Sequence, residues 1–414
     1  MTRRVLILVE NLPSPFDRRV WQEATTLRDA GWTVSILCPT GKGYDKHFEA
    51  IEGIHIWRYD LPEAAGALGY LKEYSIALTR TLLLSLKVFF TRGFDVVHAC
   101  NPPDLFFLIG TFYKLLGRKF IFDHHDLCPE LYEAKFGRRD LLWRLMRLFE
   151  RCTFNVADLS IATNESYRKI AIERGGMPPG RVFVVRSGPS LERMKVVPPD
   201  ERLKKGRRYL VGYVGVMGKQ EGIDYLLRAA AHLVHEYGRT DIQYALVGGG
   251  TSLEEMKELA RALGIADYVT FTGRVPDDEM LTVLNTADVC VNPDEANTMN
   301  DLSTMNKVME YMALGKPMVQ FDLVEGRVSA QEASLYARRN DVADFAVKLA
   351  ALLDDPELRE QMGAFGQRRV REELEWRHEA PKLLAAYETL FPLVLSDQPG
   401  SRAARIPGAI VNRR

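Results

Sequence analysis

The sequence predicts an α/β protein with two doubly wound domains that face a central cleft. First, short apolar runs alternate with amphipathic stretches, which is the pattern of parallel sheets covered by helices on both faces. Second, this alternation is interrupted once by a polar, proline-bearing segment and then resumes. Third, 414 residues are enough for two domains that each bury a full core. In such domains ligands bind at the carboxyl ends of the strands.

The first domain is predicted over residues 1–195. A helix is expected from about Asp17 to Ala30, because Asp17 is a suitable N-cap and Gly31 is a suitable stop. The strands of this domain are expected at seven apolar runs, namely RRVLILV, TVSILC, IHIWRY, DVVHA, KFIFD, DLSIAT and VFVVR.

A charged, polar linker is predicted over residues 196–208, and a second domain over 209–374. A helix over 375–395 is expected to pack back towards the first domain, and residues 396–414 are expected to form a disordered tail. The strands of the second domain are expected at RYLVGYVG, DIQYALVGG, YVTFTG, ADVCVN, PMVQFD and ASLYA.

Composition argues against several classes of function. The 55 basic and 55 acidic residues leave no net charge, so no nucleic-acid partner is expected. The five cysteines are far apart and form no CxxC motif, which argues against a zinc site or a disulfide framework. The N-terminal MTRRVLILVE is a strand and not a signal peptide, and no stretch resembles about 20 uninterrupted apolar residues. We therefore expect a cytoplasmic protein.

One segment, NTMNDLSTMNKVMEYMALGKP at residues 297–317, is typical of a nucleotide-sugar site. Ser303 or Thr304 can cap its helix, whose first amides then present a partial positive charge suited to a diphosphate. Glu310 follows on the helix, where its carboxylate can accept hydrogen bonds from two ribose hydroxyls. A capped surface helix with a solvated glutamate is the alternative that these residues leave open.

The sequence around this segment favours the nucleotide-sugar site. YLVGYVGVMG, YALVGGGTSLEEM and YVTFTGRV precede it in order. Together they resemble the nucleotide-binding half of family 4 glycosyltransferases, a retaining group with the two-domain GT-B fold. DVVHACNPPDL at 95–105 and FIFDHHDLCPE at 120–130 extend the resemblance into the first half, so it covers the chain to about residue 390. It implies an enzyme that binds a nucleotide diphosphate sugar and needs no metal or other cofactor.

The resemblance implies a donor site in the second domain. In the family, a glycine turn lines the donor cleft, and a later segment supplies backbone contacts to the base. In this chain the turn supplies Gly248 and Gly249, and the later segment supplies Arg274 and Val275. The polar loop and its helix add Ser303, Thr304, Asn306, Lys307 and Glu310.

The sequence also departs from the family. Many members neutralise the diphosphate with an arginine and a lysine, where this chain has Val216 and Glu221. Lys219 lies between them, and a lysine on its flexible stem can reach the phosphates. Leu302 stands where the family has a second glutamate, and a nearby aspartate can substitute for it.

The first domain is expected to supply the chemistry beside the sugar. By resemblance, His125 contacts the donor sugar or a substrate hydroxyl, and Asp126 orients it. A histidine that caps the strand end is the alternative. Weaker candidates for acceptor or phosphate binding are Phe16, Arg18, Arg19, His98 and Glu130. No metal ligands are predicted, because helix ends take that role in this fold.

Two stretches suggest a membrane surface. GRRDLLWRLMRLFERC at 137–152 is a basic amphipathic helix, and LGYLKEYSIALTRTLLLSLKVFF at 68–90 is long and apolar, although both are compatible with ordinary layer helices. We predict a retaining glycosyltransferase, peripheral on the inner face of the cytoplasmic membrane. Its acceptor would be a lipid-linked or growing surface glycan of exopolysaccharide, O-antigen or capsule type. The alternatives are a non-catalytic donor-binding protein and a nucleotide-sugar 2-epimerase.

Overall fold

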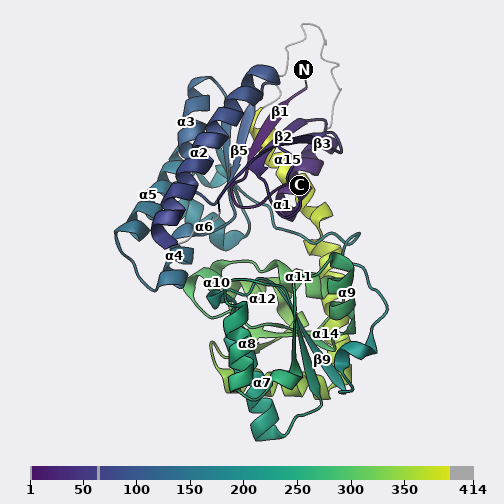
Figure 1. The fold of residues 1–414 in the computed structure, drawn as a ribbon. Helices are drawn as coiled ribbons and strands as arrows, with labels where there is room; N and C mark the ends of the chain where they lie inside the picture. Colours follow the sequence, from purple (N-terminus) through teal and green to yellow (C-terminus); the bar gives the residue numbers. More distant parts are fainter. Residues whose placement is uncertain (1, 63–65, 392–414) are drawn as a thin grey trace, which may run out of the picture.

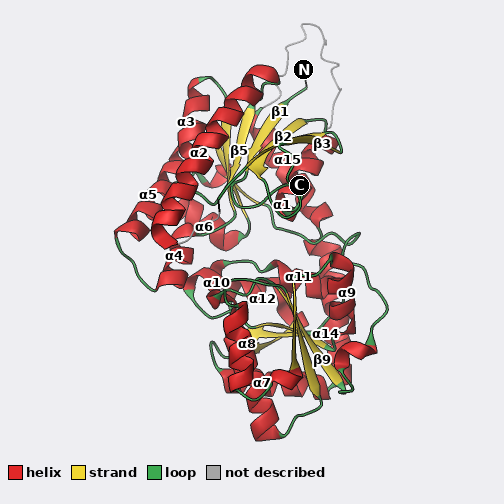
Figure 2. Cartoon of the chain, viewed as in Figure 1, coloured by secondary structure: helices red, strands yellow, loops and turns green. Residues whose placement is uncertain are grey.

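The computed structural model describes residues 2–62 and 66–391, which form two domains with one sheet in each (Figure 1). Helices pack on both faces of each sheet (Figure 2). The predicted α/β fold with two doubly wound sheets is confirmed, and every predicted strand forms.

The first sheet has eight strands in the order β3-β4-β2-β1-β5-β6-β7-β8. Strand β1 lies between β2 and β5, so the strand order reverses there and the loops after β1 and β5 flank one crevice. The strands are β1 Arg4–Leu8, β2 Thr33–Pro39, β3 Phe48–Ile51, β4 Ile54–Tyr59, β5 Val96–Cys100, β6 Lys119–His124, β7 Leu159–Ala162 and β8 Val182–Val184. The helices are α1 Arg18–Asp29, α2 Gly66–Thr91, α3 Phe107–Leu115, α4 Cys128–Phe136, α5 Leu141–Val156 and α6 Glu165–Glu173.

Strand β3 is the element of this sheet that the sequence analysis missed. It pairs antiparallel with β4 at the edge of the sheet, and none of its side chains is fully buried. The hairpin turns at Glu52 and Gly53, which both have positive φ (48° and 81°). An edge strand without a buried face carries no apolar alternation, so the pattern that predicts the other strands is lacking here.

The second sheet has six parallel strands in the order β11-β10-β9-β12-β13-β14, and its order reverses beside β9. The strands are β9 Tyr209–Val214, β10 Ile242–Val247, β11 Val269–Gly273, β12 Val289–Asn292, β13 Met318–Phe321 and β14 Ser334–Ala337. The helices are α7 Ile223–Tyr237, α8 Leu253–Ala262, α9 Asp277–Thr286, α10 Thr298–Leu302, α11 Asn306–Ala313, α12 Val324–Ala330, α13 Val342–Asp354 and α14 Pro356–Arg369.

The last described helix, α15 at Trp376–Leu390, leaves the second domain and packs on the first. Its Leu383, Ala386 and Tyr387 are fully buried in the core that α1 forms on one face of the first sheet. Trp376 Nε1 donates a hydrogen bond to Thr26 Oγ1 of α1 at 2.9 Å. Residues 392–414, which include the predicted tail at 396–414, lie outside the described residues.

Helix α2 contains a stretch, Glu73–Thr91, that is long and apolar enough to cross a membrane by length and composition, with a mean hydropathy of 1.2. Within the described residues it is the one helix that meets these two criteria. Ala77, Thr81, Ser85 and Val88 form a fully buried stripe along it. Their helical spacing turns one face of α2 towards the first sheet and leaves the other face outward.

Candidate functional site

Loops at the carboxyl ends of strands from both sheets meet between the domains. Phe16 follows β1, and the guanidinium of Arg274, which follows β11, lies 4.2 Å from its ring centroid. Arg18 Nη2 donates to Asp277 Oδ1 at 2.8 Å. Asn164, which caps α6 after β7, donates to the last carbonyl of α10 at 2.9 Å. These contacts define the candidate cleft, where doubly wound domains bind ligands.

Glu310 of α11 lies in this cleft with two arginines from outside its own domain. Its Oε1 accepts hydrogen bonds from Arg193 Nη1 at 2.8 Å and from Arg18 Nη1 at 3.4 Å. Burial, followed by the positive charge of Arg193, lowers the pKa of Arg18. Arg18 is about half exposed, and an ion pair with an exposed partner contributes about 0–1 kcal/mol to stability. Ribose hydroxyls can therefore replace Arg18 as the partner of Glu310 at little cost in free energy.

The predicted cap of this helix is wrong. No side chain caps α11, whose first turn begins at the exposed Asn306. Ser303 instead ends α10 and meets Tyr167 of the first domain, with 2.9 Å between the two hydroxyl oxygens. Thr304 Oγ1 accepts a hydrogen bond from Asn164 Nδ2 at 3.0 Å. The first amides of α11 therefore lack a side-chain acceptor, which is the arrangement that binds anions.

Lys307, which is predicted to bind the donor, is buried and paired with two carboxylates. Its Nζ donates to Asp294 Oδ1 at 2.7 Å and to Glu221 Oε2 at 3.1 Å, and 9% of the side chain is exposed. Burial raises the pKa of Asp294 to about 7, against the opposing effect of Lys307. Glu221, which replaces a basic residue of the family, is thus a partner of the buried lysine. Lys219 is exposed and remains the basic candidate of this loop.

The glycine turn after β10 has a local structural reason. A Cβ on Gly248 would lie 1.9 Å from Gly215 O, and one on Gly250 would lie 2.5 Å from Met217 O, so the loops after β9 and β10 pack backbone to backbone. Of the two predicted glycines, Gly249 is the one where an added Cβ would meet no other atom within 4 Å. Val275 packs partly buried against the core of the second domain, which leaves its backbone for the predicted base contact.

His125 follows β6 and is held by Asp123 and not by Asp126. Its Nε2 lies 2.6 Å from Asp123 Oδ2, and 14% of the side chain is exposed. Burial favours the neutral acid at Asp123, but Arg19 and His125 outweigh it and lower the pKa well below the usual value. Asp126 is half-buried, burial raises its pKa, and its main chain bonds to Asn101. The predicted orienting role therefore belongs to Asp123.

Three weaker candidates are buried within the first domain, which corrects their predicted contact with acceptor or phosphate. Arg19 donates to Asp123 Oδ1 at 2.9 Å and to the carbonyl of Val185 at 2.9 Å. His98 is fully buried. Glu130 accepts hydrogen bonds from Arg174. Buried and paired charges of this kind do not face a ligand.

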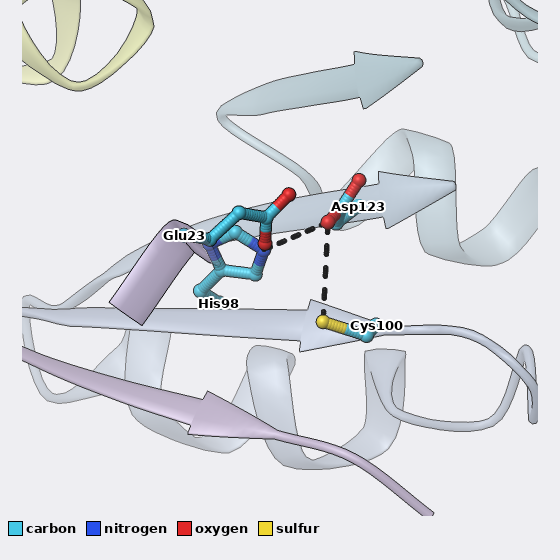
Figure 3. A group of neighbouring side chains, drawn as sticks. All are labelled: Glu23, His98, Cys100 and Asp123. Carbon is cyan, nitrogen blue, oxygen red and sulfur yellow. Dashed lines mark hydrogen bonds and ion pairs between the residues drawn. The ribbon is translucent and has the colours of Figure 1, made fainter. Parts of the chain in front are cut away.

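Four side chains beside Arg19 carry groups that could bind a metal. Glu23, His98, Cys100 and Asp123 bring their ligand atoms within 4.8 Å of one another, and His98 and Cys100 both point at the Asp123 carboxylate (Figure 3). Arg19 Nη2 lies 3.0 Å from Glu23 Oε1 and 2.9 Å from Asp123 Oδ1, so a guanidinium already balances this charge. Burial raises the pKa of the Cys100 thiol, which disfavours the thiolate that binds metals. Metal independence stays a prediction.

Three residues of this site are not among those predicted from the sequence. Asp123 could have been predicted. It lies two positions before His125 at the end of β6, and residues two apart along a strand point to the same face of the sheet. Arg193 lies before the linker, and Tyr387 lies on α15, far along the chain from the strands it meets. Only the folded chain brings these two to Glu310 and His98.

Both halves of the chain match described protein families. Residues 17–193 match the family described as Glycosyltransferase Family 4, and residues 208–355 match the one described as Glycosyl transferases group 1. The chain is 30% identical over 312 residues to the D-inositol 3-phosphate glycosyltransferase 2 of Catenulispora acidiphila, covering 68% of this chain and 70% of that protein. It is 26% identical over 272 residues to the D-inositol 3-phosphate glycosyltransferase of Corynebacterium urealyticum, and spans 62% of each.

Solved structures share the fold at lower identity. A sucrose-phosphate synthase from Thermosynechococcus elongatus has a TM-score of 0.76 at 19% identity, and the match covers 94% of this chain and 99% of that one. The HepE protein of Anabaena, solved in complex with UDP-glucose, has a TM-score of 0.68 at 14% identity, and the match covers 93% and 99%. These similarities concern the arrangement of both domains.

Proposed function

We propose a function from the premise that this chain is a member of the family 4 glycosyltransferases: its first half matches that family, and its second half matches the family described as Glycosyl transferases group 1. The protein transfers a sugar from a nucleotide diphosphate donor, held mainly by the second domain, to an acceptor that meets the first domain. The UDP-glucose bound by the Anabaena protein of the same fold supports a nucleotide-sugar donor.

The observation that carries this proposal is the position of Arg18 and Arg19 at the start of α1. Arg18 contacts Glu310 of the second domain, and Arg19 contacts His125 of the first. One helix turn therefore lies between the carboxylate that we assign to the ribose and the imidazole that we assign to the sugar. A donor whose ribose lies on Glu310 can direct its sugar towards His125.

The transfer follows from charge placement. The bond between the anomeric carbon and the diphosphate oxygen breaks, and the acceptor oxygen forms the new bond on the same face of the sugar. The acceptor proton passes to the departing diphosphate. The uncapped amides of α11 and the Lys219 ammonium stabilise the charge that develops there. No carboxylate nucleophile and no metal is required in this scheme.

An apolar surface on the first domain supports a membrane-bound acceptor. Eleven of the 18 large apolar side chains that are exposed in the described residues lie between Leu83 and Leu148. Helices α2, α3 and α5 carry nine of them and lie side by side on one face of the first sheet (Figure 1). On α3 the exposed large apolar residues are Leu108, Phe112 and Leu115, at helical spacing. Exposed apolar side chains gathered on neighbouring helices are typical of an interaction site.

The exposed stripe of α5 combines apolar and basic side chains. Leu141, Leu145 and Leu148 are exposed, and Arg144 and Arg151 lie on the same stripe at helical spacing. Such a stripe binds anionic lipid headgroups. We therefore propose that the enzyme is cytoplasmic, lies on the inner face of the membrane, and acts on a lipid-linked surface glycan.

Two arginines that the sequence analysis assigned to this surface are paired within the protein. Arg138 Nε lies 3.0 Å from Asp140 Oδ2, and Arg139 Nε lies 2.8 Å from Glu133 Oε1. Their charges are already balanced locally, so Arg144 and Arg151 are the better lipid contacts.

Product analysis tests the proposed reaction. The purified protein is incubated with sugar-labelled nucleotide sugars of several bases, together with a membrane lipid extract. We expect label in a glycolipid for one donor. Epimerisation would instead yield an altered nucleotide sugar, and a non-catalytic donor-binding protein would yield neither product, so either result overturns the proposal.

A further inference from the structure

A continuous chain of buried polar contacts runs from α15 to His125. Tyr387 OH lies 2.6 Å from His98 Nδ1, His98 Nε2 lies 3.2 Å from Asp123 Oδ2, and this oxygen lies 2.6 Å from His125 Nε2. Tyr387, His98 and Asp123 are almost completely removed from solvent. Buried polar groups linked in this way polarise and orient one another.

The ionised carboxylate in the middle determines where each proton lies. Arg19 donates to Asp123 Oδ1 at 2.9 Å and holds the carboxylate charged. A charged carboxylate only accepts hydrogen bonds, so both Nε2 atoms that face it carry protons. Burial lowers the pKa of His98, so its ring is neutral and its Nδ1 is bare. Tyr387, whose phenol pKa burial raises, therefore donates its proton to His98 Nδ1.

One contact favours the opposite tautomer of His125. Arg19 Nε lies 3.0 Å from His125 Nε2 and would donate to that nitrogen if it were bare. A bare Nε2 would, however, place its lone pair 2.6 Å from the charged Asp123 oxygen. The protonated Nε2 prevails, because the carboxylate would repel a lone pair at this short distance, whereas Arg19 still donates to Asp123, Val185 and Ser187.

We propose that Tyr387 is a positioning residue for the transfer reaction, acting through His98 and Asp123 to hold His125 with its proton on Nε2 and its Nδ1 available to the substrate. This inference rests on the proposed role of His125 beside the sugar. It assigns to α15 a function besides core packing: the helix that returns from the second domain completes the hydrogen bonding behind the imidazole.

The test combines a spectroscopic measurement with kinetics on the full chain. In protein labelled with 15N-histidine, His125→Gln identifies the ring signals of His125. We expect the wild-type ring to carry its proton on Nε2. We expect Tyr387→Phe to shift the His125 ring signals and to lower kcat about fivefold, the effect of one neutral hydrogen bond, with the donor KM changed less than about twofold.

Tyr113→Phe is the matched control. Tyr113 is equally buried in the same domain, and its OH lies 2.8 Å from Ser85 Oγ, away from His125. The control should leave the His125 signals and kcat unchanged. If Tyr387→Phe does not fold, His98→Gln serves as the second variant, with the same expected shift and loss of kcat.

Two outcomes overturn the proposal: a wild-type His125 with its proton on Nδ1, or a folded Tyr387→Phe whose His125 signals match those of Tyr113→Phe. The ring signals are read without substrate, so they test the positioning even if no sugar transfer is found. Absence of transfer with the expected ring signals would count against the proposed function alone.

Discussion

At the scale of single residues, the candidate site is built from charges whose partners decide their roles. Arg18 and Arg19 are neighbours, yet the first is about half exposed in the cleft and the second is buried between two carboxylates. The exposed arginine is available to exchange partners when a ligand arrives, and the buried one is not. Glu310 and His125 are therefore the residues at which substitution tests the proposed function most directly.

Glu310→Gln is expected to weaken donor binding and leave the fold intact. The carboxylate is the proposed acceptor for the ribose hydroxyls, and losing a charged hydrogen-bond partner costs about 1.5–3 kcal/mol. The dissociation constant of the donor, measured by calorimetry, should rise about ten- to a hundredfold. Glu255→Gln, an exposed change on α8, is the control. Unchanged affinity in a folded Glu310→Gln protein would remove the ribose assignment.

His125→Ala is expected to lower turnover more than donor affinity. The ring is placed beside the reacting sugar, whereas the nucleotide is held by the second domain, so the loss falls on the transition state. Steady-state kinetics should give a reduced kcat and a nearly unchanged donor KM. Normal turnover would assign His125 to the structural role of a strand-end cap.

Glu10 makes stability depend on pH. Burial, followed by the charge of Glu73, raises its pKa from 4.5 to about 8. Between these values the folded protein holds a proton that the unfolded chain releases, so the unfolding free energy falls as the pH rises, by up to about 1.4 kcal/mol per pH unit. Measured by urea unfolding from pH 5 to 8, the unfolding free energy of Glu10→Gln should fall less with pH than that of the wild type. Equal slopes in Glu10→Gln and the exposed control Glu236→Gln would contradict this.

At the scale of elements, helices with and without a side-chain cap both occur, and the uncapped α11 is the one that carries Glu310. In five helices an aspartate or asparagine side chain caps the N-terminus: Asp17 on α1, Asp140 on α5, Asn164 on α6, Asp341 on α13 and Asp355 on α14. Helix α11 has none, although serine and threonine precede it. Departures from local rules are common at functional sites, and this one leaves amides for a diphosphate.

Helix α5 carries the prediction on membrane binding. Each basic residue near an anionic surface contributes about 1 kcal/mol, so the double variant Arg144→Glu with Arg151→Glu should lower partitioning onto anionic vesicles about thirtyfold or more. High salt should weaken wild-type binding in the same direction. Sedimentation with vesicles measures both effects.

The control for this experiment makes the same charge change in the second domain, at Arg228 and Arg261. It should bind vesicles like the wild type, and donor binding should survive in both double variants. A wild-type protein that does not sediment with anionic vesicles at low salt would make the stripe a solvated face and favour a soluble acceptor.

At the scale of the whole molecule, a nucleotide held mainly by the second domain should stabilise the folded protein. A ligand that binds only the native state at a hundred times its Kd adds about 2.7 kcal/mol to the unfolding free energy. Thermal unfolding with a panel of nucleoside diphosphates should therefore raise the Tm for one base, and the rise should shrink in Glu310→Gln. No shift with any nucleotide would contradict donor binding.

The order of strands and helices follows from local patterns in the chain. Apolar runs and periodic stretches predict every strand except β3, which lacks a buried face, and they place Glu310 on its helix. The predicted site residues fall into two groups, those that a ligand can reach and those that are buried in pairs. Glu310 and Arg18 lie in the cleft and His125 is partly exposed after β6, whereas four predicted residues are buried and paired with groups that the sequence does not reveal: Arg19, His98, Glu130 and Lys307.

The physical reason is the distance along the chain between interacting charges. Burial of apolar residues at a period of two or 3.6 is a local property, so it can be read from neighbouring residues. Whether a charged side chain faces a ligand depends on groups that arrive from elsewhere: Asp123 for Arg19, Arg193 for Glu310 and Tyr387 for His98. The sequence thus predicts the fold and the edge of the sheet where ligands bind, and only the packing of both domains and α15 decides which side chains remain to bind them.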